Sequence, residues 1–121
     1  MLINKKDIIG INQEIGESGQ FHNESSLDFA LSIIKNKPWL YELVYIIRSL
    51  LVDHAFQEGN KRTALSIAMT YIEDKNLEYD KLRLSVVIYK IAKNNIKDIN
   101  KIVRLIKSVI FWESQENYRK K

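Results

Sequence analysis

Hydrophobic residues recur at intervals of three and four positions along most of the chain, which places them on one face of an α-helix. One such stripe runs through residues 40–51. The clearest one consists of Ile102, Leu105, Ile106, Val109 and Ile110. No segment shows the sustained alternation of apolar and polar residues that would predict a β-strand. The pattern therefore predicts an all-α fold.

Capping residues and turn formers divide this pattern into about six helices. The predicted helices cover residues 4–15, 24–35, 38–54, 61–74 and 80–93, and a last helix starts near residue 98. The predicted N-terminal caps are Asn4, Asn23, Asp80 and Asp98. Gly16 is expected to stop the first helix, and Pro38 to lie near the start of the third.

A single domain is expected over residues 1–121, because this length suits one domain and the sequence shows neither a repeat nor an interdomain linker. Apolar residues make up 45% of the chain, which is enough for a core at this size. Phe111 and Trp112 are expected to close that core. Residues 113–121 are expected to form a flexible tail.

Composition and charge exclude several kinds of protein. The chain has no cysteine, which excludes disulfides, zinc–thiolate sites and thiol nucleophiles. Its net charge of +4 comes from basic residues that alternate with acidic and apolar ones, a pattern more typical of solvated helices than of a nucleic-acid interface. The sequence has no apolar run of membrane-spanning length and no apolar block of a signal peptide at its start. We therefore expect a cytoplasmic protein that binds neither nucleic acid nor membranes directly.

The candidate chemistry is concentrated in residues 54–65, which read HAFQEGNKRTAL and lie between two predicted helices. His54 is expected at the end of the preceding helix, where an imidazole can take a proton from a hydroxyl group. Glu58 is a carboxylate of the kind that binds Mg²⁺ together with phosphate oxygens. Phe56 is expected to anchor the loop in the core.

The second half of this run predicts a phosphate site. Gly59 and Asn60 indicate a turn, with Asn60 as the N-cap of the next helix. Glycine lets the backbone approach a ligand closely, and free amide groups at a helix start bind anions. Lys61 and Arg62 place two cations in the first helical turn, where the helix dipole disfavours positive charge. A bound polyphosphate would reverse that unfavourable effect.

Each residue of the run, taken alone, also fits a structural role such as a helix-end histidine, a loop acid or a cap. The ordered set resembles the signature of the Fic/Doc family, H-x-F-x-[D/E]-G-N-G-R-x-x-R. The matching residues are His54, Phe56, Glu58, Gly59, Asn60 and Arg62. Lys61 replaces the second glycine of the pattern and Leu65 replaces its last arginine. Both departures resemble the Doc (death-on-curing) branch, whose run ends N-K-R-T-A.

The resemblance implies a role for each matching residue. His54 would be the base for a hydroxyl group of a target protein, and Glu58 would bind Mg²⁺. The phosphates of ATP, or of another nucleoside triphosphate, would be held by Gly59, Asn60, Lys61 and Arg62. Residues 16–23 would form a flap that aligns the target, with Ser18, Gly19, Gln20, Phe21 and His22 nearest to it. A helix connection without a functional role is the alternative for this segment.

The implied function is a toxin-type transferase that phosphorylates a protein hydroxyl, with a translation elongation factor as the expected target. Lys61 would crowd the usual α-phosphate position, and Leu65 supplies no second phosphate clamp. The alternatives are AMP transfer to Ser, Thr or Tyr, as in Fic enzymes, and a non-catalytic nucleotide- or protein-binding module. The sequence lacks the inhibitory [S/T]-x-x-x-E-[G/N] motif of many Fic proteins. The resemblance therefore implies restraint by a separate antitoxin, or no restraint at all.

Overall fold

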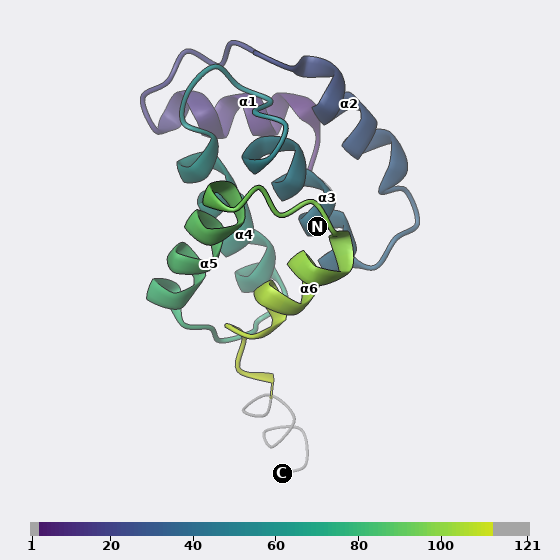
Figure 1. Ribbon diagram of the computed structural model, residues 1–121, viewed down its shortest axis with the longest axis vertical. Helices are drawn as coiled ribbons and strands as arrows, with labels where there is room; N and C mark the ends of the chain where they lie inside the picture. Colours follow the sequence, from purple (N-terminus) through teal and green to yellow (C-terminus); the bar gives the residue numbers. More distant parts are fainter. Residues whose placement is uncertain (1–2, 113–121) are drawn as a thin grey trace.

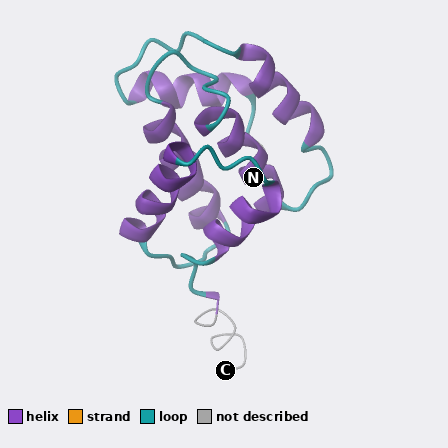
Figure 2. Cartoon of the chain, in the orientation of Figure 1, coloured by secondary structure: helices purple, strands orange, loops and turns teal. Residues whose placement is uncertain are grey.

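The computed structural model describes residues 3–112, and in this part of the chain helices alternate with irregular connections (Figures 1 and 2). The helices are α1 (Lys5–Glu14), α2 (Glu24–Ile33), α3 (Trp39–Leu51), α4 (Asn60–Asp74), α5 (Lys81–Lys93) and α6 (Ile99–Lys107). The predicted all-α bundle of about six helices is therefore confirmed. The predicted tail, residues 113–121, lies outside the described residues. No helix in the described part combines the length and apolar character needed to cross a lipid bilayer.

Helix α3 is the centre of the bundle, because it packs against α2, α4, α5 and α6. Nine of its thirteen residues are buried, so it is apolar on most of its circumference. Helix α1 lies against α4 at one end of the molecule, and α5 and α6 pack against each other toward the other end (Figure 1). The end of α3 and the start of α4 consequently lie close to the connection between α1 and α2.

Four of the predicted helix caps are confirmed. Asn4, Asn23, Asp80 and Asp98 each accept a hydrogen bond from a backbone N–H in the first turn of the following helix. Such a cap contributes about 1 kcal/mol to stability by satisfying an otherwise free donor. Gly16 follows the end of α1 with a φ of +97°, a conformation that glycine adopts without strain.

The predicted end of the third helix is wrong. Helix α3 ends at Leu51 rather than at His54, which lies beyond it with a left-handed φ of +53°. A left-handed residue turns the chain away from the helix axis, as it commonly does at helix ends. The N–H of Ala55 then donates to Ser49 O at 3.1 Å, which satisfies one of the last carbonyls of the helix.

The prediction that Phe111 and Trp112 close the core is also wrong. Their side chains are 44% and 37% exposed, whereas the preceding Val109 and Ile110 are buried. The ring of Trp112 lies 6.3 Å from that of Trp39 at a tilt of 38°. These two rings join the end of the described chain to the start of α3.

A buried hydrogen bond joins α3 to α4. Tyr71 is fully buried, and its hydroxyl donates to Glu42 Oε1 at 2.5 Å. Burial, reinforced by the bond to Glu42, raises the pKa of Tyr71 above its usual range. A tyrosine in the unfolded chain ionises near pH 10. The contribution of Tyr71 to the free energy of unfolding is therefore complete below about pH 10 and declines as the pH rises above that value.

Tyr71→Phe is expected to lower the free energy of unfolding by about 1.5–3 kcal/mol, because Glu42 stays buried without its donor. Tyr41→Phe is the control, since Tyr41 donates to Asn100 at the exposed surface. Its removal is expected to cost at most about 0.5 kcal/mol. Urea unfolding followed by circular dichroism measures both changes. The decline in stability above about pH 10 is also expected to be smaller in Tyr71→Phe than in the unmodified protein. Equal losses of unfolding free energy in Tyr71→Phe and Tyr41→Phe would contradict the stabilising role of the buried hydrogen bond.

Candidate functional site

The candidate site lies where two connections run side by side: residues 15–23, between α1 and α2, and residues 52–59, between α3 and α4 (Figure 1). Backbone hydrogen bonds of 2.8–3.0 Å join them: His22 N and Asn23 N donate to Ala55 O, and Gln57 N donates to Gln20 O. The segment predicted as a flap is therefore held directly against the segment that contains the sequence motif.

Phe56 anchors the motif, as the sequence predicts. Its side chain is only 1% exposed, and its ring stacks on that of Phe21 with 4.9 Å between the centroids. Lys5 covers the other ring from α1, with Nζ 5.3 Å from the centroid of Phe21. Lys5 also pairs with Glu24 and Asp28 of α2, and these two carboxylates raise the pKa of Lys5 above its usual range. The aromatic pair thus ties both connections to the first two helices.

Asn12 of α1 is a buried polar residue at the site, with 1% of its surface exposed. Its Nδ2 donates to Glu58 O at 3.0 Å and to Thr63 Oγ1 at 3.1 Å. Its Oδ1 accepts from Gly19 N at 2.9 Å. One amide therefore fixes the flap segment, the motif loop and the first turn of α4 relative to one another.

The start of α4 differs from the prediction. The helix begins at Asn60, and Gly59 is the N-cap, with a left-handed φ of +76°. Asn60 therefore caps nothing. Its Oδ1 accepts from Phe56 N at 3.0 Å, and its Nδ2 donates to Phe56 O at 2.9 Å. Since Gly59 has no side chain to cap the helix, the amide groups of the first turn remain available to an anion.

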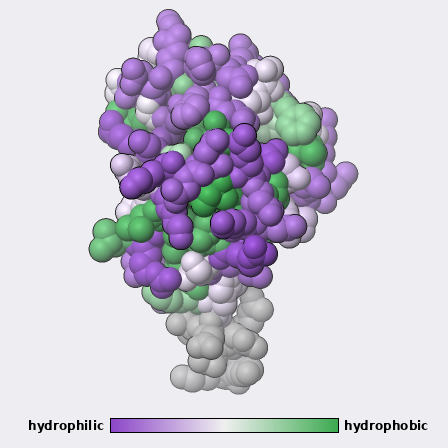
Figure 3. All heavy atoms as spheres, in the orientation of Figure 1, coloured by the Kyte–Doolittle hydropathy of each residue, from purple (hydrophilic) through white to green (hydrophobic). Residues whose placement is uncertain are grey.

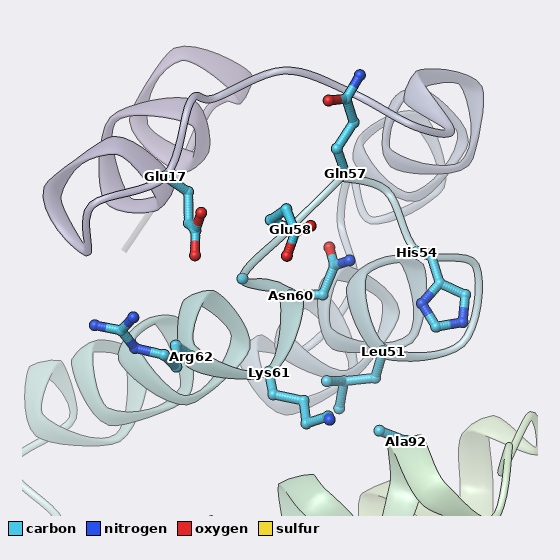
Figure 4. Close-up of a pocket in the computed structure, with 10 residues that line it drawn as sticks. Glu17, Leu51, His54, Gln57, Glu58, Asn60, Lys61, Arg62 and Ala92 are labelled. Carbon is cyan, nitrogen blue, oxygen red and sulfur yellow. The ribbon is translucent and has the colours of Figure 1, made fainter.

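A pocket of about 420 Å³ opens at this helix start (Figure 4). Its walls are Glu17, Leu51, His54, Gln57, Glu58, Gly59, Asn60, Lys61, Arg62 and Ala92. The side chains of His54 and Glu58 are exposed, so both are open to a ligand in solution. The structure thus brings together around one pocket every residue of the motif that the sequence predicts to be catalytic, metal-binding or phosphate-binding.

The two cations leave the helix start in different directions. Figure 4 shows Lys61 extending toward Leu51 and Ala92, whereas Arg62 extends to the opposite side, away from His54. The ammonium of Lys61 lies 5.1 Å from the ring centroid of Tyr89. Arg62 also borders a second hollow, of about 310 Å³, along α4. Positive charge therefore flanks the pocket on both sides of the helix start.

The predicted flap residues occupy a different place from the motif residues. Ser18, Gly19, Gln20, Phe21 and His22 do not line the pocket, although their backbone pairs with the motif. From this segment it is the side chain of the neighbouring Glu17 that reaches the pocket (Figure 4).

Several residues of the site were not predicted from the sequence: Asn12, Glu17, Leu51, Gln57 and Ala92. Asn12 carried a usable signal, because it follows Ile8 by four residues and so occupies an otherwise apolar helix face. A polar residue at such a position requires hydrogen-bond partners from other segments. The contributions of Glu17 and Ala92 depend on tertiary packing alone.

Asn12→Ala is expected to lower the free energy of unfolding by roughly 1–3 kcal/mol, because Glu58 O, Gly19 N and the Thr63 hydroxyl each lose their buried partner. Asn94→Ala is the control, since Asn94 is an exposed residue at the end of α5. Chemical denaturation gives both values. Hydrogen exchange is also expected to be faster at the amide of Gly19 in Asn12→Ala, and unchanged exchange there would contradict the bridging role.

Gly59→Ala is expected to be more destabilising than Gly16→Ala, although both glycines have positive φ. A Cβ at position 59 would lie 2.7 Å from Glu17 Cγ, whereas a Cβ at position 16 has nothing within 4 Å. In both variants alanine must adopt a left-handed backbone, which costs about 1–2 kcal/mol. Only Gly59→Ala adds a steric clash. The double variant Gly59→Ala/Glu17→Ala is expected to recover part of the difference in thermal stability. Equal melting temperatures for the two single variants would refute the close approach.

Comparisons of the chain with models of known protein families and with curated proteins found no match. The residues around the pocket are therefore the basis on which a function is proposed.

Proposed function

We propose that the protein is a Doc-like transferase that moves the γ-phosphoryl group of ATP to a hydroxyl group of a target protein. One observation carries the proposal: a single pocket is surrounded by His54, by Glu58, by the start of α4, which has no side-chain cap, and by two cations. This set contains a base, a metal-binding carboxylate and an anion-binding helix start. Phosphoryl transfer needs these parts because its catalysis consists mostly of positioning and of stabilising phosphate charge.

In the proposed reaction the oxygen of the target hydroxyl forms a bond to the γ-phosphorus, and the bond from that phosphorus to the β–γ bridging oxygen breaks. The products are a phosphorylated side chain and ADP. His54 takes the proton of the hydroxyl group, a role for which histidine is the most common side chain. Its exposed position at the mouth of the pocket suits a target that is itself a protein.

The residues present fit ATP with Mg²⁺. In phosphotransfer sites Mg²⁺ is usually bound by one or two carboxylates together with phosphate oxygens and water. Glu58 supplies one such carboxylate beside the helix start, and residues 3–112 contain no cluster of three or more acidic, histidine or cysteine side chains that would form an all-protein metal site. Mg²⁺ would neutralise phosphate charge there. Asn60, Lys61 and Arg62 would hold the phosphates through backbone amides and the two cations.

Two positions favour phosphoryl transfer over AMP transfer. Lys61 stands where the Fic pattern has glycine, and its side chain lies along the pocket wall. Leu65 stands where that pattern has arginine, and it packs against the core instead of supplying a cation. AMP transfer remains the alternative reaction for the same pocket, and a non-catalytic nucleotide- or protein-binding module is the alternative without chemistry.

The proposed partners follow from the same resemblance. The target would be a protein of the translation machinery, with an elongation factor as the first candidate. A separate antitoxin would restrain the enzyme. Both partners would approach the face on which the residue 15–23 and residue 52–59 connections meet, because His54 is accessible there.

Incubation of the protein with host lysate and ATP labelled at either the α- or the γ-phosphate tests the reaction. Label is expected in a target protein from γ-labelled ATP only. His54→Asn is expected to reduce the labelling rate by about 10²–10⁴-fold, the usual contribution of a general base. Asparagine is chosen because it tolerates the left-handed backbone at this position. Asp53→Asn, a change of the exposed neighbour that does not line the pocket, is the matched control and is expected to retain the rate.

Label from the α-phosphate would replace the proposal with AMP transfer. Absence of label from both positions, together with a cellular effect that survives His54→Asn, would favour the non-catalytic module.

A further inference from the structure

Helix α5 carries apolar side chains on two opposite faces. The core face consists of Leu84, Ile88 and Ile91, which are at most 2% exposed. The other face carries Leu82, Val86 and Tyr89, which are 75%, 58% and 56% exposed. At about 100° per residue these three side chains fall within about 60° of the helix circumference, so they form one row, here called the α5 ridge.

The α5 ridge is more than a scatter of single exposed residues. Isolated apolar side chains are normal on protein surfaces, whereas contiguous ones mark interaction sites. Figure 3 shows hydrophobic surface projecting over the position that α5 has in Figure 1, between hydrophilic side chains. Partner proteins recognise amphipathic helices by burying apolar side chains that are spaced three and four residues apart, as these three are.

The charged side chains within α5 itself are all basic. The helix contains Lys81, Arg83, Lys90 and Lys93 and no acidic residue. Lys93 continues the row itself, and Arg83 and Lys90 lie along one side of it. Such a border repels a basic partner and attracts an acidic one.

The α5 ridge is also continuous with the pocket. Tyr89 lies under the ammonium of Lys61, with 5.1 Å between Nζ and the ring centroid, and Ala92 of the same helix forms part of the pocket wall. A chain segment bound along α5 would therefore end at the mouth of the pocket.

We propose that the α5 ridge is the docking surface for an acidic, amphipathic helical segment of a protein partner. The segment lays apolar side chains, spaced three and four residues apart, on Leu82, Val86 and Tyr89, and its carboxylates face the basic border. Docking of this kind requires no chemistry at His54. The docking proposal can therefore be tested independently of the proposed transfer reaction.

Selection of a displayed library of random 16-residue peptides on the full chain tests the docking surface. The enriched peptides are expected to be acidic, with apolar residues at helical spacing. Val86→Glu is expected to weaken binding of those peptides by about tenfold or more, the effect of losing one buried side chain and adding a like charge. Phe29→Glu is the matched control, because Phe29 is 53% exposed on a different helix, and it is expected to change affinity by less than about twofold.

Three results would overturn the docking proposal. The first is enrichment of no peptide, or of neutral or basic ones. The second is binding that Val86→Glu and Phe29→Glu weaken equally. The third is a dimer in sedimentation velocity that Val86→Glu dissociates, since the ridge would then be covered by a second copy of this chain. Circular dichroism of each variant establishes that the fold is intact.

Discussion

The site depends on the requirement that the buried amide of Asn12 be fully hydrogen-bonded. A buried amide without partners would cost more than the protein gains from most single contacts, so the three segments that satisfy it are held in one arrangement. The bond to Gly19 sets the path of one connection, the bond to Glu58 O sets the other, and the bond to Thr63 sets the helix that follows. The geometry of the pocket is therefore determined by Asn12, a buried residue that does not itself line the pocket.

Several residues of the motif have a backbone conformation or a charge that is locally unfavourable. His54 has a left-handed backbone, which is strained for a residue other than glycine, and Lys61 and Arg62 oppose the dipole of α4. Such features persist only where the surrounding structure compensates for them. Here the compensation comes from Asn12, from the paired connections and from the buried ring of Phe56. A protein that only had to be stable would have little reason to collect these costs within nine residues, and this concentration supports a binding role for the pocket.

Features set by local chemistry could be predicted from the sequence, and features set by packing could not. The caps at Asn4, Asn23, Asp80 and Asp98 are local hydrogen bonds, and the helices follow from short-range periodicity. The motif residues were identified because they are contiguous in the chain. Asn60 was misassigned because the side chain of a turn residue can hydrogen-bond either to the following helix, as a cap, or to preceding residues, as Asn60 does to Phe56. Only the path of the chain in the folded protein decides between the two. Glu17 and Ala92 reach the pocket from distant segments that carry no shared pattern.

The contact between Trp39 and Trp112 has a practical consequence for spectroscopy. These are both of the tryptophans in the sequence, so all intrinsic indole emission originates where the end of the described chain meets the first turn of α3. The pocket borders the last turn of the same helix, which at 1.5 Å per residue is roughly 18 Å away. A ligand that enters the pocket would therefore leave tryptophan fluorescence unchanged unless the whole bundle readjusts. A quiet fluorescence titration is fully compatible with saturation, and occupancy has to be followed with a labelled ligand or by calorimetry.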